Sequence, residues 1–224
     1  MTPTMGAALL FDLDGTLVDS DAGHLEAFQR VFAPHGVALD RDQYIAKIMG
    51  ASNAAIARAF LSHLPLDLQV EILLAKEAAY RDSLGALEPI AGAGALLDFA
   101  DARGLRRAVV TNAPRANADV VLKAIGLDAR LPIRVIGGEL ARSKPDPLPY
   151  LTGLERTGAR AEHSVAFEDS PSGVRAGVAA GLAVVGVTTS LGAKQLVELG
   201  ATMAVADFTD PRVYQLIESR MPRM

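Results

Sequence analysis

The stretch "AALLFDLDGT", residues 7–16, decides the fold, because it joins an unbroken apolar run to two closely spaced acids. A run such as Ala7–Phe11 is typical of a parallel strand that is buried on both faces. Asp12 and Asp14 follow it only two residues apart, and crowded carboxylates are costly to bury without compensation. Open water, a bound cation or a reaction that needs unequal carboxylates would each supply that compensation.

Further along the chain, short runs rich in Val, Leu and Ile predict more buried strands. These are Ala108–Val110, Ile133–Ile136, Ser164–Phe167, Ala183–Val187 and Met203–Ala206. Stretches of helical length separate most of them. Ser170-Pro171 predicts a helix start, with an N-cap before proline, and Gly181 predicts the end of that helix. The alternation predicts an α/β fold built on a doubly wound parallel sheet.

One segment, residues 20–85, interrupts this alternation with helical patterns only, such as Ala54–Leu64 and Leu66–Leu84. We therefore expect an all-helical cap domain at 20–85, inserted into an α/β catalytic core formed by residues 1–19 and 86–224. An insertion is tolerated where the two ends of a surface loop lie close together. Ser20 and the stretch Leu84–Pro89 are the predicted hinges of this insertion.

Composition narrows the class of protein. The 224 residues carry a net charge of −4 and no cysteine, which excludes disulfides and thiolate metal sites. No basic cluster is present, so we expect neither nucleic acid nor an anionic membrane as partner. No apolar stretch approaches the roughly 20 residues that span a bilayer. The first apolar run lacks the basic flank of a signal peptide. We expect a soluble, cytoplasmic protein, and the oligomeric state stays open.

Polar clusters follow several of the predicted strands or lie in loops between them. They are Asp12/Asp14, Thr111-Asn112, Lys144 and Glu168-Asp169. Ligands of open α/β sheets bind at the carboxyl ends of the strands, where three of these clusters fall. Several carboxylates, one lysine and small hydrogen-bonding groups together fit a divalent cation with a phosphoryl group.

Four motifs in order then resemble the haloacid dehalogenase (HAD) superfamily: "DLDGT" (residues 12–16), "VVTN" (109–112), "SKPDP" (143–147) and "FEDSPSGVRAGVAAG" (167–181). A helical insertion after the first motif is similar to the subgroup with phosphoglycolate phosphatase-like and β-phosphoglucomutase-like enzymes. The resemblance implies a Rossmann-like core with a helical cap and Mg²⁺ as cofactor. It also implies hydrolysis of a small phosphorylated metabolite, either a sugar phosphate or a phosphoglycolate-like compound.

Roles for the acids follow from the resemblance. Asp12 is implied as the nucleophile that becomes an aspartyl phosphate. Asp14 is implied as the acid that protonates the leaving oxygen and then deprotonates water, with its backbone carbonyl as a metal ligand. Asp12, Asp169 and Glu168 complete the implied Mg²⁺ shell through hard oxygen atoms. Asp19 reads instead as a hinge or helix-capping residue.

The same resemblance assigns the groups around the phosphate. Lys144 would offset negative charge, and Thr111 with the backbone N–H of Asn112 would hold phosphoryl oxygens for in-line attack. Gly15 would give the chain room to turn beneath the phosphate. His24 matches a histidine that assists the second aspartate in the sugar-phosphate branch, although a lone histidine is more often structural.

Other chemistries of the superfamily remain as alternatives. Asp14 argues against dehalogenases and phosphonatases, which lack this second aspartate. A β-phosphoglucomutase-like sugar phosphomutase is the main alternative to the phosphatase. In such mutases a lysine and an arginine of the cap grip the distal phosphate, and Met49 and Asn53 fall in those two places here. This loss of cations favours hydrolysis, with Asn53 as a substrate-binding residue. A catalytically inactive protein that uses the same fold for binding is a third hypothesis. Independently of that choice, we expect the cap to act as a lid.

Overall fold

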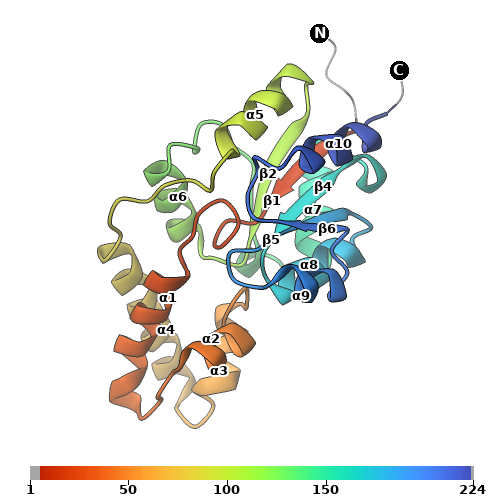
Figure 1. Cartoon of the computed structure of the whole chain (residues 1–224). Coiled ribbons are helices and arrows are strands. Elements are labelled where there is room, and N and C mark those ends of the chain that lie inside the picture. The colour runs from red at the N-terminus through yellow and green to blue at the C-terminus, as the bar shows by residue number, and fades with distance from the viewer. Residues whose placement is uncertain (1–5, 223–224) are drawn as a thin grey trace.

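A single parallel sheet lies at the centre of the computed structural model, which describes residues 6–222 (Figure 1). Its strands are β1 (Ala8–Phe11), β2 (Arg106–Thr111), β3 (Arg134–Ile136), β4 (Val165–Glu168), β5 (Ala183–Val187) and β6 (Met203–Val205). They pair in the order β3-β2-β1-β4-β5-β6, each pair parallel. All predicted strands are present, and β2 extends the predicted run at both ends.

The strand order changes direction at β1: β2 and β3 are added on one side of it, and β4, β5 and β6 on the other. Phe11, the last residue of β1, lies in register with Val109 and with Phe167. The rings of Phe11 and Phe167 stack with centroids 4.8 Å apart, so the end of β1 is held from the side. Such a switch point opens a crevice beyond the carboxyl ends of the strands.

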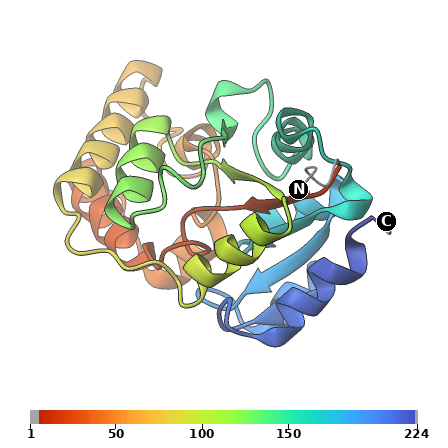
Figure 2. The same cartoon turned by 90° about the horizontal axis from the view of Figure 1, so that it is seen from above.

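Helices cover both faces of the sheet, as the view from above shows (Figure 2). The core helices are α5 (Ala93–Ala102), α6 (Arg115–Ala124), α7 (Leu148–Thr157), α8 (Pro171–Ala179), α9 (Ala193–Glu198) and α10 (Pro211–Arg220). Leu9 and Phe11 face α5, α6 and α10 in one apolar cluster, while Leu10 faces α7 and α8 in the other. The α8 start is confirmed: Ser170 is its N-cap, and its hydroxyl accepts from the Gly173 amide. The doubly wound α/β prediction is therefore confirmed.

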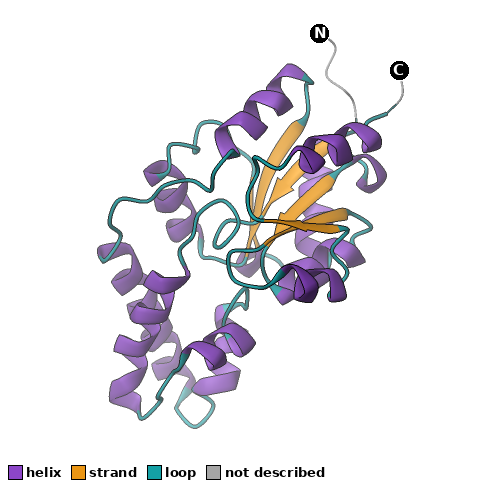
Figure 3. Cartoon of the chain, in the orientation of Figure 1, coloured by secondary structure: helices purple, strands orange, loops and turns teal. Residues whose placement is uncertain are grey.

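Residues 20–85 contain helices only, and these lie beyond the carboxyl edge of the sheet (Figures 1 and 3). They are α1 (Asp21–Phe32), α2 (Arg41–Lys47), α3 (Asn53–Phe60) and α4 (Leu66–Asp82). Short 3₁₀ turns occur at Ala33–His35, Gly137–Glu139 and Ala161–His163. We call α1–α4 the cap. The two segments that connect the cap to the core run side by side, because Val18 forms an isolated β-bridge with Pro89.

Asp19 does not cap a helix, so the helix-capping alternative of its prediction is wrong, and the hinge alternative stays a prediction. It is exposed, and the N-cap position of α1 is occupied by Ser20 instead. The Ser20 hydroxyl makes no capping hydrogen bond, because it donates to Asp14 at 2.7 Å. Within residues 6–222, no helix has both the length and the apolar character required to cross a membrane.

Candidate active site

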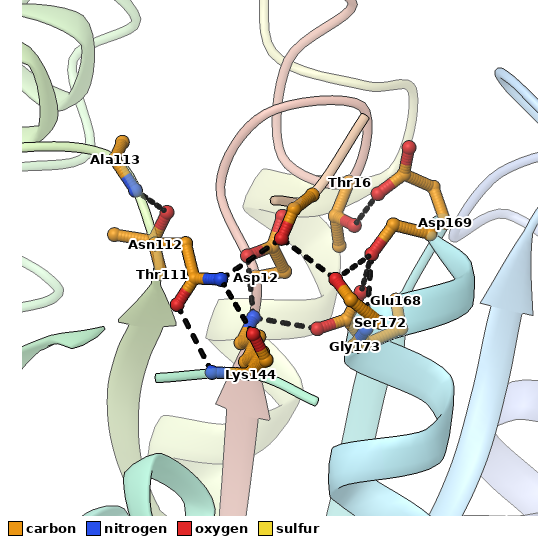
Figure 4. A network of polar contacts seen from close by, with 12 residues as sticks. Asp12, Thr16, Thr111, Asn112, Ala113, Lys144, Glu168, Asp169, Ser172 and Gly173 are labelled. Carbon is orange, nitrogen blue, oxygen red and sulfur yellow. Dashed lines mark hydrogen bonds and ion pairs between the residues drawn. The ribbon is translucent and has the colours of Figure 1, made fainter. Parts of the chain in front are cut away.

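Asp12 lies directly after β1, at the switch point of the sheet. Its backbone amide donates to the carbonyl of Phe167 at 3.0 Å, which fixes the first residue of the loop to β4. The Lys144 ammonium lies 2.6 Å from Asp12 Oδ1 and 2.6 Å from Glu168 Oε1 (Figure 4). All three side chains are buried. The lysine therefore bridges two carboxylates that come from neighbouring strands.

Three of the predicted metal ligands, Asp12, Glu168 and Asp169, form a compact buried group. One carboxylate oxygen from each lies within 4.8 Å of the others. Burial raises the pKa of Asp12 to about 8, although the Lys144 charge opposes the shift. Burial, followed by the charges of Asp12 and Glu168, raises the pKa of Asp169 well above its ordinary value. Three carboxylates against one lysine leave excess negative charge, which fits a divalent cation bound through hard oxygen.

Asp169 is oriented from two sides. Thr16 donates to its Oδ1 at 3.2 Å, and Ser190 donates to its Oδ2 at 3.0 Å. Gly15 has φ +76°, and a Cβ there would lie 2.1 Å from Asp169 Oδ2. Gly15, predicted to give the chain room to turn beneath a phosphate, therefore also leaves room for this carboxylate. Only glycine combines that positive φ with so close an approach.

Glu168 is held as firmly as Asp169. The hydroxyl of Tyr150 donates to its Oε1 at 2.6 Å, and that of Ser170 donates to its Oε2 at 3.2 Å. The fixed carboxylate and Lys144 leave Asp12 little freedom, which suits a group that must approach a substrate in one direction. We call Asp12, Lys144, Glu168 and Asp169 the core charge cluster.

Thr111 and Asn112 follow β2, as predicted. Thr111 is buried, and its hydroxyl accepts from the Ala113 amide at 3.0 Å. The Asn112 side chain does something that the sequence did not indicate. Its amide donates to the carbonyl of Gly50 at 2.9 Å and to that of Lys144 at 3.2 Å. The loop after β2 therefore contacts both the main chain at Lys144 and the cap.

Asp14 has an environment of its own. Ser20 donates to its Oδ1 at 2.7 Å, and His24 Nε2 lies 3.2 Å from the same oxygen. Burial acts to raise the pKa of Asp14, but the neighbouring His24 and Ser20 outweigh it and lower the pKa. Asp12 and Asp14 are thus shifted in opposite directions although they are two residues apart. The carboxylate of Asp14 is not among the three that form the metal-binding group.

A buried network from the cap faces these acids. Lys76 Nζ lies 3.0 Å from His24 Nδ1 and 3.1 Å from Glu77 Oε2. Glu77 also accepts from Asn53 at 3.0 Å and from Asn117 of the core at 2.6 Å. Burial lowers the pKa of Lys76, although Glu77 opposes the shift. We call His24, Asn53, Lys76 and Glu77 the cap charge cluster.

Sequence reasoning missed Lys76, Glu77 and the core residue Asn117. The signal for Lys76 was present: it lies four residues from both Ile72 and Tyr80, on the buried face of α4. A lysine on an apolar helix face is unusual unless it is paired. Asn117 gave no comparable signal, because its role depends on how α4 packs against α6.

The whole cap charge cluster lines a small cavity of about 70 Å³, and the core charge cluster reaches it through Asp12 alone. Asp12, Asp14 and Thr111 line it from the core side, and the cap contributes His24, Asn53, Lys76 and Glu77. The remaining cap residues on this cavity are Asp21, Phe28, Tyr44, Ile48, Met49, Gly50, Ala51 and Ile56. Of the other predicted site residues, Asn112 lines it too, whereas Gly15, Lys144, Glu168 and Asp169 do not, although Lys144 contacts Asp12 directly.

The parallel sheet, the helical cap and the acid-rich crevice between them define a Rossmann-like α/β enzyme with an inserted cap. Residues 9–187 match the family of haloacid dehalogenase-like hydrolases, which is most of the chain. The chain belongs to this family, which confirms the resemblance seen in its motifs.

Relatives of known name span nearly the whole chain. Validoxylamine A 7′-phosphate phosphatase of Streptomyces hygroscopicus is 33% identical, covering 91% of this chain and 94% of the relative. Phosphoglycolate phosphatase of Rhodospirillum rubrum is also 33% identical, covering 91% of this chain and 88% of the relative. The crystal structure of CbbY from Rhodobacter sphaeroides in complex with phosphate superposes with a TM-score of 0.80 at 28% identity. It covers 92% of this chain and 96% of that one.

Proposed function

We propose that the chain is a Mg²⁺-dependent phosphatase that hydrolyses a small phosphate monoester through an aspartyl-phosphate intermediate. One observation carries the proposal. Two aspartates border one cavity, and Asp12 belongs to a charge cluster with excess negative charge while Asp14 is held separately by Ser20 and His24. Their surroundings shift the two pKa values apart, and such a split is typical of sites in which two acids take different roles. The phosphatase names of several relatives support the same chemistry.

Asp12 would attack phosphorus with one carboxylate oxygen, forming an O–P bond as the ester O–P bond breaks. Its anion has to be available, and Lys144 at 2.6 Å favours the charged form. A divalent cation held by Asp12, Glu168, Asp169 and the carbonyl of Asp14 would neutralise the phosphoryl oxygens and lower the pKa of Asp12. Lys144 would meanwhile keep the nucleophile in place.

Asp14 would move the protons of both half-reactions. In its protonated form it would donate to the leaving oxygen, so that the product departs as a neutral alcohol. As a carboxylate it would then accept a proton from the water that attacks the aspartyl phosphate, and inorganic phosphate would leave. Ser20 and His24 bind one oxygen of Asp14, which orients the other for these transfers.

Thr111 and the backbone N–H of Asn112 would bind the phosphoryl oxygens opposite the metal ligands. Their place at the end of β2, beside the end of β1 that Asp12 follows, supports this assignment. The cap would open to admit the substrate and close to exclude water. The paired connecting segments near Ser20 and residues 84–89 support a hinge there.

Hydrolysis is favoured over a sugar phosphomutase. Met49 is buried among apolar residues, and the Asn53 amide donates to Glu77. Neither side chain brings a positive charge to grip a second phosphate. The substrate proposed is therefore a small mono-phosphorylated metabolite in the cytoplasm, with nucleic acid and membranes playing no part.

A panel of phosphate esters with Mg²⁺, scored for free phosphate and for isomerised ester, tests the proposal. We expect stoichiometric phosphate release that EDTA abolishes and Mg²⁺ restores. Isomerised product without phosphate release would establish the mutase instead. Full phosphate release in EDTA would refute the metal dependence.

A further inference from the structure

The cap side of the catalytic cavity holds one lysine, and its contacts leave it no capacity for a substrate anion. Lys76 Nζ lies 3.1 Å from Glu77 Oε2, 3.0 Å from His24 Nδ1 and 4.2 Å from the centroid of the Phe28 ring. The residue is only 3% exposed. An ammonium group has three donors, and these three neighbours occupy them.

Two acids on the same side outnumber this lysine, because Glu77 balances its charge and Asp21 adds a further negative one. Glu77 is 3% exposed, and its carboxylate accepts hydrogen bonds from Asn53, Asn117 and Lys76. Asp21 also lines the cavity, and it accepts from Tyr44 at 2.9 Å and from Ser190. Among the described residues that line this cavity, no arginine is present and no lysine other than Lys76. The cap therefore presents paired or negative charge toward the leaving group.

This arrangement matters most for charge close to the ester. A carboxylate one carbon away from the ester would enter the cavity of about 70 Å³ beside Glu77. Burying an anion without a partner is unfavourable, and nearby carboxylates make it more so. Hydroxyl groups incur no such penalty, because they can donate to carboxylate oxygens and accept from amides such as Asn53.

We propose that the cap selects esters whose leaving group is uncharged next to the phosphate, as in sugar and polyol phosphates, and rejects phosphoglycolate-like esters. Glu77 is the specificity-determining residue. This inference rests on the proposed phosphatase function. It distinguishes between the two substrate classes that the motifs leave open.

A matched pair of esters tests the selection. 2-Phosphoglycolate and 2-hydroxyethyl phosphate have the same chain length, and only the former carries a carboxylate in place of the hydroxymethyl group. With Mg²⁺ present, we expect kcat/KM for 2-hydroxyethyl phosphate to exceed that for phosphoglycolate by at least about thirtyfold. A wild-type preference for phosphoglycolate, or equal values, would overturn the inference while leaving the phosphatase intact. Failure of every ester in the panel would instead remove the proposed function itself.

Charge removal locates the cause. Glu77→Gln frees Lys76 from its carboxylate, and we expect the ratio to fall at least about tenfold through faster phosphoglycolate turnover. Glu71→Gln is the control, because Glu71 is exposed on the same helix and should leave the ratio unchanged. If Glu77→Gln does not fold, Asp21→Asn serves as the second variant, with a smaller fall in the same direction. A folded Glu77→Gln enzyme with the wild-type ratio would contradict the assignment.

Discussion

In the core charge cluster three buried carboxylates share one lysine, whereas in the cap charge cluster Lys76 is matched by Glu77 and by neutral neighbours. The charged side chains of both clusters are buried, and both clusters reach the same cavity, the core cluster through Asp12 alone. The core cluster has an excess of negative charge that a cation can neutralise, and burial together with neighbouring carboxylates raises the pKa values of Asp12 and Asp169. The cap cluster has its charges paired internally.

This difference separates two tasks. The uncompensated charges of the core cluster would hold metal and phosphate, so variants that remove these charges should abolish phosphate release. A compensated set offers no strong site for an ion, and it acts by what it excludes and by how it orients Asp14. Variants of the core cluster should therefore cost far more activity than variants of the cap cluster.

Asp12→Asn should have the largest effect. The amide is isosteric with the carboxylate but is a far poorer nucleophile, so we expect phosphate release to fall by at least about 10⁴-fold. The change should leave the fold intact, because one fewer charge relieves repulsion within the cluster. Steady-state phosphate release and thermal unfolding measure both points. Activity within tenfold of wild type would contradict the nucleophile assignment.

Lys144→Met should cost both activity and stability. It leaves Asp12 and Glu168 without their shared cation, and breaking a buried pair costs about 3–5 kcal/mol. We expect activity to drop about a thousandfold. We expect the free energy of unfolding in EDTA to drop by about 3–5 kcal/mol, and Mg²⁺ should restore part of this stability. Lys194→Met is the control, because Lys194 is 89% exposed and its surface pair should contribute little. Equal losses in the two variants would argue against a buried bridge.

The pH dependence of Mg²⁺ affinity should follow Asp12. Its pKa is raised from 3.8 to about 8, so without the cation the group holds a proton across the neutral range. Its contribution to metal-free stability is therefore complete below pH 3.8 and is lost as the pH rises to about 8. Because binding then releases that proton, and Asp169 with its raised pKa can release another, affinity should rise by at least about tenfold per pH unit below this pKa. Calorimetric titrations between pH 6 and 9 measure the slope, and Asp12→Asn should reduce it.

His24→Gln should give the smallest effect of these four, about tenfold in kcat. Burial raises the pKa of Asp14, and His24 is the main group that opposes it. Without His24 the acidic limb of the kcat–pH profile should move to higher pH. His63→Gln, at an exposed position, should change neither quantity. A change in kcat with an unmoved profile would show that His24 acts on packing alone.

The sequence predicts the core wall of the site better than the cap wall for a physical reason. Apolar runs identify strands, and a parallel sheet brings all their carboxyl ends to one edge, so Asp12, Thr111 and Glu168 could be placed together. Local sequence also predicted the α8 start, since Ser170 and Pro171 are adjacent in the chain.

The cap contacts depend on tertiary packing that no local pattern encodes. Glu77 meets Asn117 only because α4 lies against α6, forty positions further along the chain. The helix-capping alternative for Asp19 was wrong for a related reason: the neighbouring Ser20 occupies the N-cap position, and its hydroxyl donates to Asp14 rather than capping the helix. The positions of domain boundaries and hinges stay predictions.

The contact at Gly50 has a consequence for how such enzymes diversify. Asn112 and Ser172 of the core both donate to the Gly50 carbonyl, and a Cβ at this glycine would lie 2.4 Å from Ser170 Oγ. The core therefore grips main chain rather than a side chain. Neighbouring positions such as Met49 and Asn53 are free to change without loss of that grip. Enzymes of this kind could thus change substrate through cap side chains while the contact between core and cap at Gly50 is kept. Of the residues in this cap segment, only the glycine would then have to stay the same.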